Sequence, residues 1–171
     1  MIMKPNARKL ALATHVAASV GSLGAVAAFL ALALSGLASH DPGMRHAVYL
    51  AMELITWFII VPLIVASLLS GIVSSLGTPW GLLRHYWVLV KLLLTVFAGV
   101  VLLFQLRPIR MAAAAAAGAG ADLGTLKIQL VVHAAGGLLV LLVATALSVY
   151  KPRGMTRYGV RRTEERPPSL A

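Results

Sequence analysis

The sequence predicts an all-α membrane protein, a bundle of four transmembrane helices that run up and down with both termini in the cytoplasm. Three observations support this fold class: four long apolar stretches, scarce charge within them, and basic residues unevenly distributed between them. The chain has 171 residues, of which 60% are apolar and 12% are charged. A soluble helical protein of this size keeps a polar face on each helix, so its apolar runs stay short.

Each apolar stretch is long enough to cross a hydrocarbon core of about 30 Å as a helix. The four predicted spans are residues 10–37, 47–76, 86–106 and 128–149. Because the bilayer core offers no water to backbone amides, a span must satisfy its own hydrogen bonds, as a helix does. One transmembrane domain therefore accounts for residues 1–160, and residues 161–171 are expected to form a disordered basic tail.

The distribution of basic residues predicts the orientation. If the helices alternate in direction, one side of the membrane holds Lys4, Arg8, Lys9, Arg84, Lys151, Arg153, Arg157, Arg161, Arg162 and Arg166. The other side holds Arg45, Arg107, Arg110 and Lys127. An excess of Lys and Arg marks the cytoplasmic face, so both termini are predicted in the cytoplasm. The net charge of +10 does not predict nucleic-acid binding, because no basic patch interleaved with aromatic residues is present.

Prolines and small residues shape the predicted spans. Pro62 lies in the middle of the second span and is expected to kink it. Pro108 is expected to end the third helix, and the Ala/Gly-rich residues 112–121 to form an outer loop or a frayed helical extension. Small residues that allow close helix approach are Gly21, Gly24, Ala28, Gly136 and Gly137. These faces predict packing in the bundle and association with a protein partner or a second copy.

Ionisable residues within a span are costly and are treated as functional hypotheses. Four qualify by position: His15, Glu53, Lys91 and His133. At a rise of about 1.5 Å per residue, Glu53 and His133 lie about 12 and 9 Å inside the outer boundary charges. By the same measure, His15 and Lys91 lie about 9 and 10 Å inside the inner ones. Depth therefore predicts two pairs, Glu53 with His133 and His15 with Lys91.

The helical faces support the first pair more than the second. His46, Tyr49 and Glu53 recur at three- and four-residue steps and form one stripe of the second span. On the fourth span, Gln129, His133, Gly136 and Gly137 share a face, and the glycines predict close packing against the helix that carries Glu53. This arrangement is interpreted as an interhelical hydrogen bond that fixes register, as a proton or cation site, or as a cofactor or ligand pocket.

The second pair has simpler interpretations. The long stem of Lys91 can extend toward the inner interface near Trp87, one helical turn away. His15 shares a face with Ser19 and Ser22, which favours a hydrogen-bonded packing residue over a ligand.

Histidines on all four spans also raise the alternative of haem b. The candidate axial pairs are His15 with His85 and His46 with His133. His85 and His46 stand at helix starts, whereas their partners lie about six residues deeper, an offset of roughly 9 Å. Helix tilt can remove only part of this offset, so one haem is kept as an alternative, two are not expected, and no cofactor is the leading expectation.

Other chemistries find little support. The chain has no cysteine, which excludes thiolate metal sites and cysteine nucleophiles. His40, Asp41 and His46 lack a tight ligand spacing, so no metal site is predicted. No serine stands in a nucleophile elbow, so no catalytic residue is predicted either.

Three segments carry a resemblance: GTPWGLLRHYWVLVK at residues 77–91, HAAGG at 133–137 and YKPRG at 150–154. They resemble a family of small bacterial inner-membrane proteins of unknown function. The resemblance covers the first span through Gly159 and implies the same four-helix topology, but it brings no established activity and no functional residues. A fainter similarity of layout, centred on the helix that carries His15, links the chain to copper-resistance D proteins and haem-dependent protoporphyrinogen oxidases.

The leading functional expectation is a non-catalytic subunit, scaffold or assembly partner, embedded in the bilayer. The alternatives are a haem-binding or redox protein that uses intramembrane histidines, and a proton- or cation-handling protein centred on Glu53.

Overall fold

The computed structural model describes residues 3–77, 84–118, 123–151, 154–157 and 160–161. Helices account for nearly all of these residues. They are α1 (Pro5–Ala38), α2 (Pro42–Ile55), the π-helical turn η1 (Thr56–Ile60), α3 (Val61–Leu76), α4 (Tyr86–Ala117) and α5 (Leu126–Tyr150). Within the described residues the one β feature is an isolated bridge between His85 and Met155. The all-helical fold class is confirmed.

The elements α2, η1 and α3 form one continuous rod, so they count as a single long helix. With this rod included, four helices of the described chain are long and apolar enough to cross a membrane. Their bounds are Pro5–Ala38, Pro42–Leu76, Tyr86–Ala117 and Leu126–Tyr150. Each contains one of the four predicted spans. This agreement supports a multi-pass membrane protein.

The helix starts follow from local sequence. Pro5 and Pro42 stand in the first turns of α1 and α2, where a missing N–H costs no helical hydrogen bond. Asp41 caps α2, since its Oδ2 accepts from the Met44 amide at 2.7 Å. At the end of α5, Lys151 adopts the left-handed conformation with φ of 42° and stops the helix.

The second span is interrupted just before Pro62. In η1 the Val61 amide donates to the Thr56 carbonyl, an i to i−5 bond that widens the turn. The Thr56 hydroxyl donates to the Met52 carbonyl at 2.7 Å. The disturbance that the sequence predicts at Pro62 thus takes the form of a π turn on its amino-terminal side.

Pro108 does not end the third span, contrary to the sequence expectation. It lies inside α4, which continues to Ala117. The residues that follow it, Ile109, Ala112 and Ala113, are buried in the core. Packing of this segment against its neighbours outweighs the one backbone bond that proline removes. Up to Ala117, the Ala-rich tract is therefore a packed helix, and residues 119–122 lie outside the described part.

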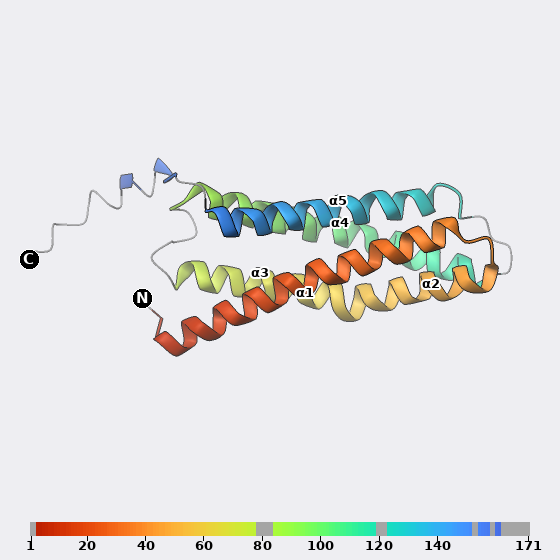
Figure 1. The fold of residues 1–171 in the computed structure, drawn as a ribbon, viewed down its shortest axis with the longest axis horizontal. Helices are drawn as coiled ribbons and strands as arrows, with labels where there is room; N and C mark the ends of the chain where they lie inside the picture. The colour runs from red at the N-terminus through yellow and green to blue at the C-terminus, as the bar shows by residue number, and fades with distance from the viewer. Residues whose placement is uncertain (1–2, 78–83, 119–122, 152–153, 158–159, 162–171) are drawn as a thin grey trace, which may run out of the picture.

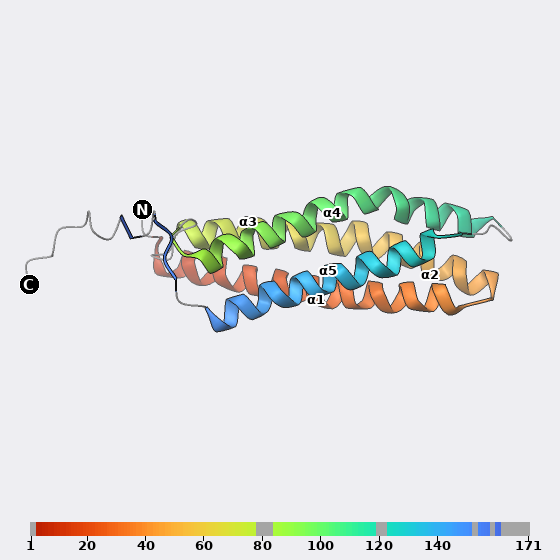
Figure 2. The same cartoon turned by 90° about the horizontal axis from the view of Figure 1, so that it is seen from above.

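The helices form an elongated bundle (Figures 1 and 2). The start of α1 and the end of α5 lie at one end, here called the terminal end; the α1–α2 connection and the start of α5 lie at the other, the hairpin end. Helix α1 packs against α2, α3 and α5, and α4 packs against α2, α3 and α5.

Apolar side chains form both the core of the bundle and much of its outer surface. The main apolar cluster lies toward the hairpin end and comprises Val26, Phe29, Ala33, Val48, Tyr49, Met52, Ile60, Ile109, Ala112, Ala113, Leu123, Leu130 and Ala134. The outer surface of the molecule is also apolar, with Phe58 and Phe104 more than three-quarters exposed. Such a surface suits contact with lipid chains.

Candidate functional site

The structure brings His15 of α1 and Lys91 of α4 into direct contact. His15 Nε2 lies 3.2 Å from Lys91 Nζ. On the other side of the ring, Nδ1 lies 2.9 Å from the Ser67 carbonyl oxygen and 3.3 Å from Ser70 Oγ. A carbonyl oxygen only accepts hydrogen bonds, so Nδ1 carries the proton and donates to Ser67. With Lys91 protonated, Nε2 accepts from its ammonium, which requires a neutral imidazole.

Serine side chains extend this contact to the remaining spans. Lys91 Nζ donates to Ser148 Oγ of α5 at 2.6 Å, and Ser148 donates to the Ala144 carbonyl at 3.0 Å. Ser19 Oγ of α1 lies 2.8 Å from Ser67 Oγ of α3. We call this set, His15, Ser19, Ser67, Ser70, Lys91 and Ser148, the polar network. It joins all four long helices.

Gly71 of α3 makes room for the His15 ring. A Cβ at this position would lie 2.9 Å from His15 Cε1, closer than real Cβ contacts allow. The sequence alone did not mark Gly71, Ser67, Ser70 or Ser148 as part of a site. Their signal was weak, because glycine and serine are common in membrane helices and serine often bonds its own backbone.

The structure does not bring Glu53 and His133 together. Glu53 Oε1 lies 3.9 Å from Nε of Arg110, a side chain that is 77% exposed. His133 is exposed on the outside of the bundle, and its Nδ1 bonds the Gln129 carbonyl of its own helix at 2.8 Å. The two residues match in depth, but their helices are not packed against each other. Both α2 and α5 pack against α1 and α4.

A different polar contact joins α4 and α5 in this half. Gln129 Nε2 donates to Gln105 Oε1 at 3.2 Å, and Gln105 is buried. Gln129 was a predicted candidate; its partner was not, because an amide in an apolar run shows no charge or spacing that marks it.

The remaining stripe residues of α2 lie at the hairpin end. Tyr49 is 1% exposed, and its hydroxyl has no hydrogen-bond partner among the described residues. The buried Nδ1 atom of His46 likewise finds no partner in the described part of the chain. The Tyr49 ring fits against Gly36 of α1, where a Cβ would lie 2.9 Å from the ring Cζ.

The predicted packing residues divide into two groups. Gly21 faces Leu63 and Gly137 faces Val26, so both line helix contacts inside the bundle. Gly24 and Gly136 have open space around a Cβ, and Ala28 is exposed, so these three face outward. The expected close approach of Gly136 to the Glu53 helix is absent.

The histidines fit haem poorly in this arrangement. Both ring nitrogens of His15 are engaged, one as donor to Ser67 and one as acceptor from Lys91, so neither offers a free lone pair to iron. His133 is exposed, and its Nδ1 is engaged by the Gln129 carbonyl of its own helix. His85 precedes α4 and pairs with Met155 at the terminal end. Among the described residues, no group of three or more His, Cys, Asp or Glu is placed to hold a metal ion.

Comparisons with protein-family models, with curated proteins and with solved structures found no match to this chain. The family resemblance noted from the sequence therefore stays a prediction. What the findings define is a helical chain with four helices long and apolar enough to span a membrane.

Proposed function

We propose that this protein is a non-catalytic subunit or scaffold of the bacterial plasma membrane, a four-span, up-and-down bundle with both termini in the cytoplasm. The polar network supports a structural role, because its members bond each other and the backbone across α1, α3, α4 and α5. Interhelical hydrogen bonds in membranes contribute roughly 0.6–2 kcal/mol each, enough to fix register.

One observation carries the assembly role: small residues face outward. Gly24 and Ala28 of α1 and Gly136 of α5 are exposed, and a Cβ at either glycine would contact nothing. In a membrane, small outward residues allow another helix to approach closely. We infer that a helix of a partner, or of a second copy, packs there.

The test is the mass of the complex that survives gentle purification. We expect Gly24→Leu and Gly136→Leu to shift the wild-type complex toward the monomer, because Leu blocks close approach. Leu103→Phe, at an exposed large residue of α4, is the matched control and should leave assembly unchanged. A wild-type protein that is monomeric both in lipid nanodiscs and after crosslinking in cells would refute the proposal.

An absorption spectrum of the same sample distinguishes the proposed scaffold from the alternative of a haem-binding protein. A Soret band that disappears in His15→Ala would show that the His15–Lys91 contact opens to admit iron, and it would replace the structural role proposed here.

A further inference from the structure

Among the residues that the structure describes, the Lys91 ammonium has no negatively charged neighbour. Its two hydrogen-bond partners, His15 Nε2 and Ser148 Oγ, are both neutral. The acidic residues that the structure describes are Asp41, which caps α2, and Glu53, which pairs with Arg110. Both lie in the hairpin half. Within the described chain, no carboxylate contacts Lys91.

A half-buried ammonium is stabilised by a bound anion. Removing an ammonium from water costs several kcal/mol unless an opposite charge or several hydrogen bonds replace the water. Lys91 has three N–H donors, and two of them have partners in the protein. Lys91, His15 and Ser148 are each only partly buried, so the group is not sealed inside the bundle.

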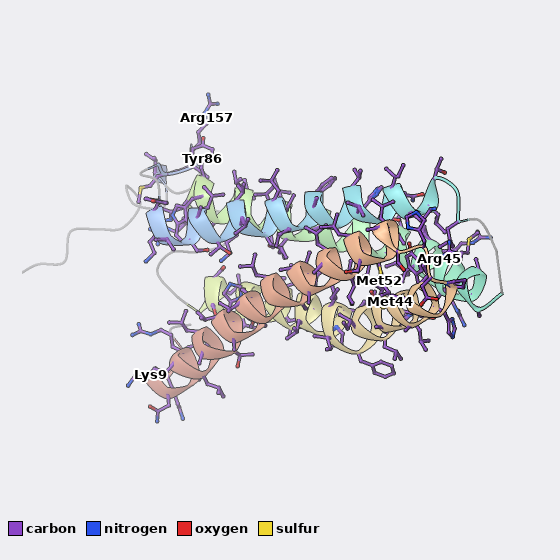
Figure 3. The ribbon with its side chains drawn as sticks, turned by 45° about the vertical axis from the view of Figure 1, so that its right-hand side comes forward. Lys9, Met44, Arg45, Met52, Tyr86 and Arg157 are labelled. Atoms are coloured by element: carbon purple, nitrogen blue, oxygen red, sulfur yellow. The ribbon has the colours of Figure 1, made fainter. Side chains whose placement is uncertain are left out.

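The surroundings of the polar network select the class of anion. Lys4, Arg8, Lys9, Lys151, Arg157 and Arg161 are exposed basic residues at or beyond the terminal end. Figure 3 shows Lys9 and Arg157 at this end, on opposite sides of the bundle. Such a ring of positive charge attracts the anionic headgroups of a membrane leaflet.

The helix surfaces beside Lys91 are apolar. From Lys91 toward the middle of the bundle, the exposed side chains include Leu93 and Phe97 of α4 and Leu142 and Val143 of α5. A soluble anion gains nothing from these side chains, whereas the acyl chains of a phospholipid can lie along them. We propose that the terminal end binds an anionic phospholipid, with its phosphodiester on the Lys91 ammonium and its chains on α4 and α5.

Native mass spectrometry of the full-length protein from nanodiscs tests this proposal. The nanodiscs contain equal amounts of phosphatidylglycerol and phosphatidylcholine, and the measured quantity is the ratio of the two lipids that stay bound. We expect a several-fold enrichment of phosphatidylglycerol on the wild type and on Lys91→Arg. Lys91→Met keeps the apolar stem without the charge and should lose the enrichment.

Arg110→Met is the matched control, because it removes one positive charge at the other end and should keep the enrichment. Equal retention of the two lipids by the wild type overturns the proposal without any variant, so a Lys91→Met protein that does not fold leaves the test intact. Equal enrichment on Lys91→Met and Arg110→Met also overturns it. Loss of enrichment in millimolar inorganic phosphate would assign the site to a soluble anion instead.

Discussion

At the scale of single residues, the contact between His15 and Lys91 follows from simple geometry. The two side chains stand at similar depth when counted from the flanking basic residues, and the structure places their nitrogens 3.2 Å apart. Glu53 and His133 are also matched in depth, but they do not meet. Depth along a helix is encoded in the sequence, whereas the order of helices around the bundle depends on packing of all four.

The fit of Tyr49 against Gly36 gives a prediction at this scale. We expect Gly36→Ala to lower the free energy of unfolding by about 1–3 kcal/mol, because the new Cβ would lie 2.9 Å from a ring that cannot move outward. Unfolding in mixed detergent micelles, followed by circular dichroism, measures the change.

Gly24→Ala is the matched control, since a Cβ there meets no atom within 4 Å. It should be neutral or slightly stabilising, because alanine favours the helix over glycine. Equal destabilisation by both substitutions would contradict the role assigned to the Tyr49 contact.

At the scale of elements, the sequence predicted the existence and approximate bounds of all four spans, because an uninterrupted apolar run of this length is rarely anything but a membrane span. It did not predict that α4 passes through Pro108 to Ala117. A local rule treats proline as a helix stop, whereas burial of Ala112 and Ala113 against other helices is a tertiary effect. The sequence did not predict the π turn either, because only Pro62, which follows it, is recognisable in the sequence.

The π turn leads to a prediction about deletions. A π turn accommodates one extra residue, so deletion of Phe58 should convert η1 into a regular helical turn and keep the faces of α2 and α3 in register. Phe58 is 76% exposed, so little packing is lost. We expect this variant to express and to elute as one peak in size-exclusion chromatography.

Deletion of Leu69 is the comparison. This residue is also exposed, but it lies in regular helix of α3, where a deletion rotates every following residue by about 100°. The rotation moves Ser70 and Gly71 away from His15, so we expect loss of the folded protein. If both deletions are tolerated equally, η1 does not act as an inserted residue.

At the scale of the whole molecule, the even number of candidate spans and the charge distribution predict the position of the termini. We expect a fluorescent-protein fusion to the carboxyl end to fluoresce and an alkaline phosphatase fusion there to be inactive, as befits a cytoplasmic terminus. The same reporters at the amino end should give the same result. Opposite results at the two ends would require an odd number of spans.

The uneven distribution of the apolar cluster has a mechanical consequence. Near the α1–α2 connection, interlocked side chains such as Phe29, Tyr49 and Met52 resist separation, because any gap there forfeits dispersion contacts. At the opposite extremity, directional bonds centred on His15 and Lys91 add to a smaller apolar contact that includes Ala18, Val88 and Ala144. The helices are therefore expected to separate more readily at the chain ends than at the α1–α2 connection.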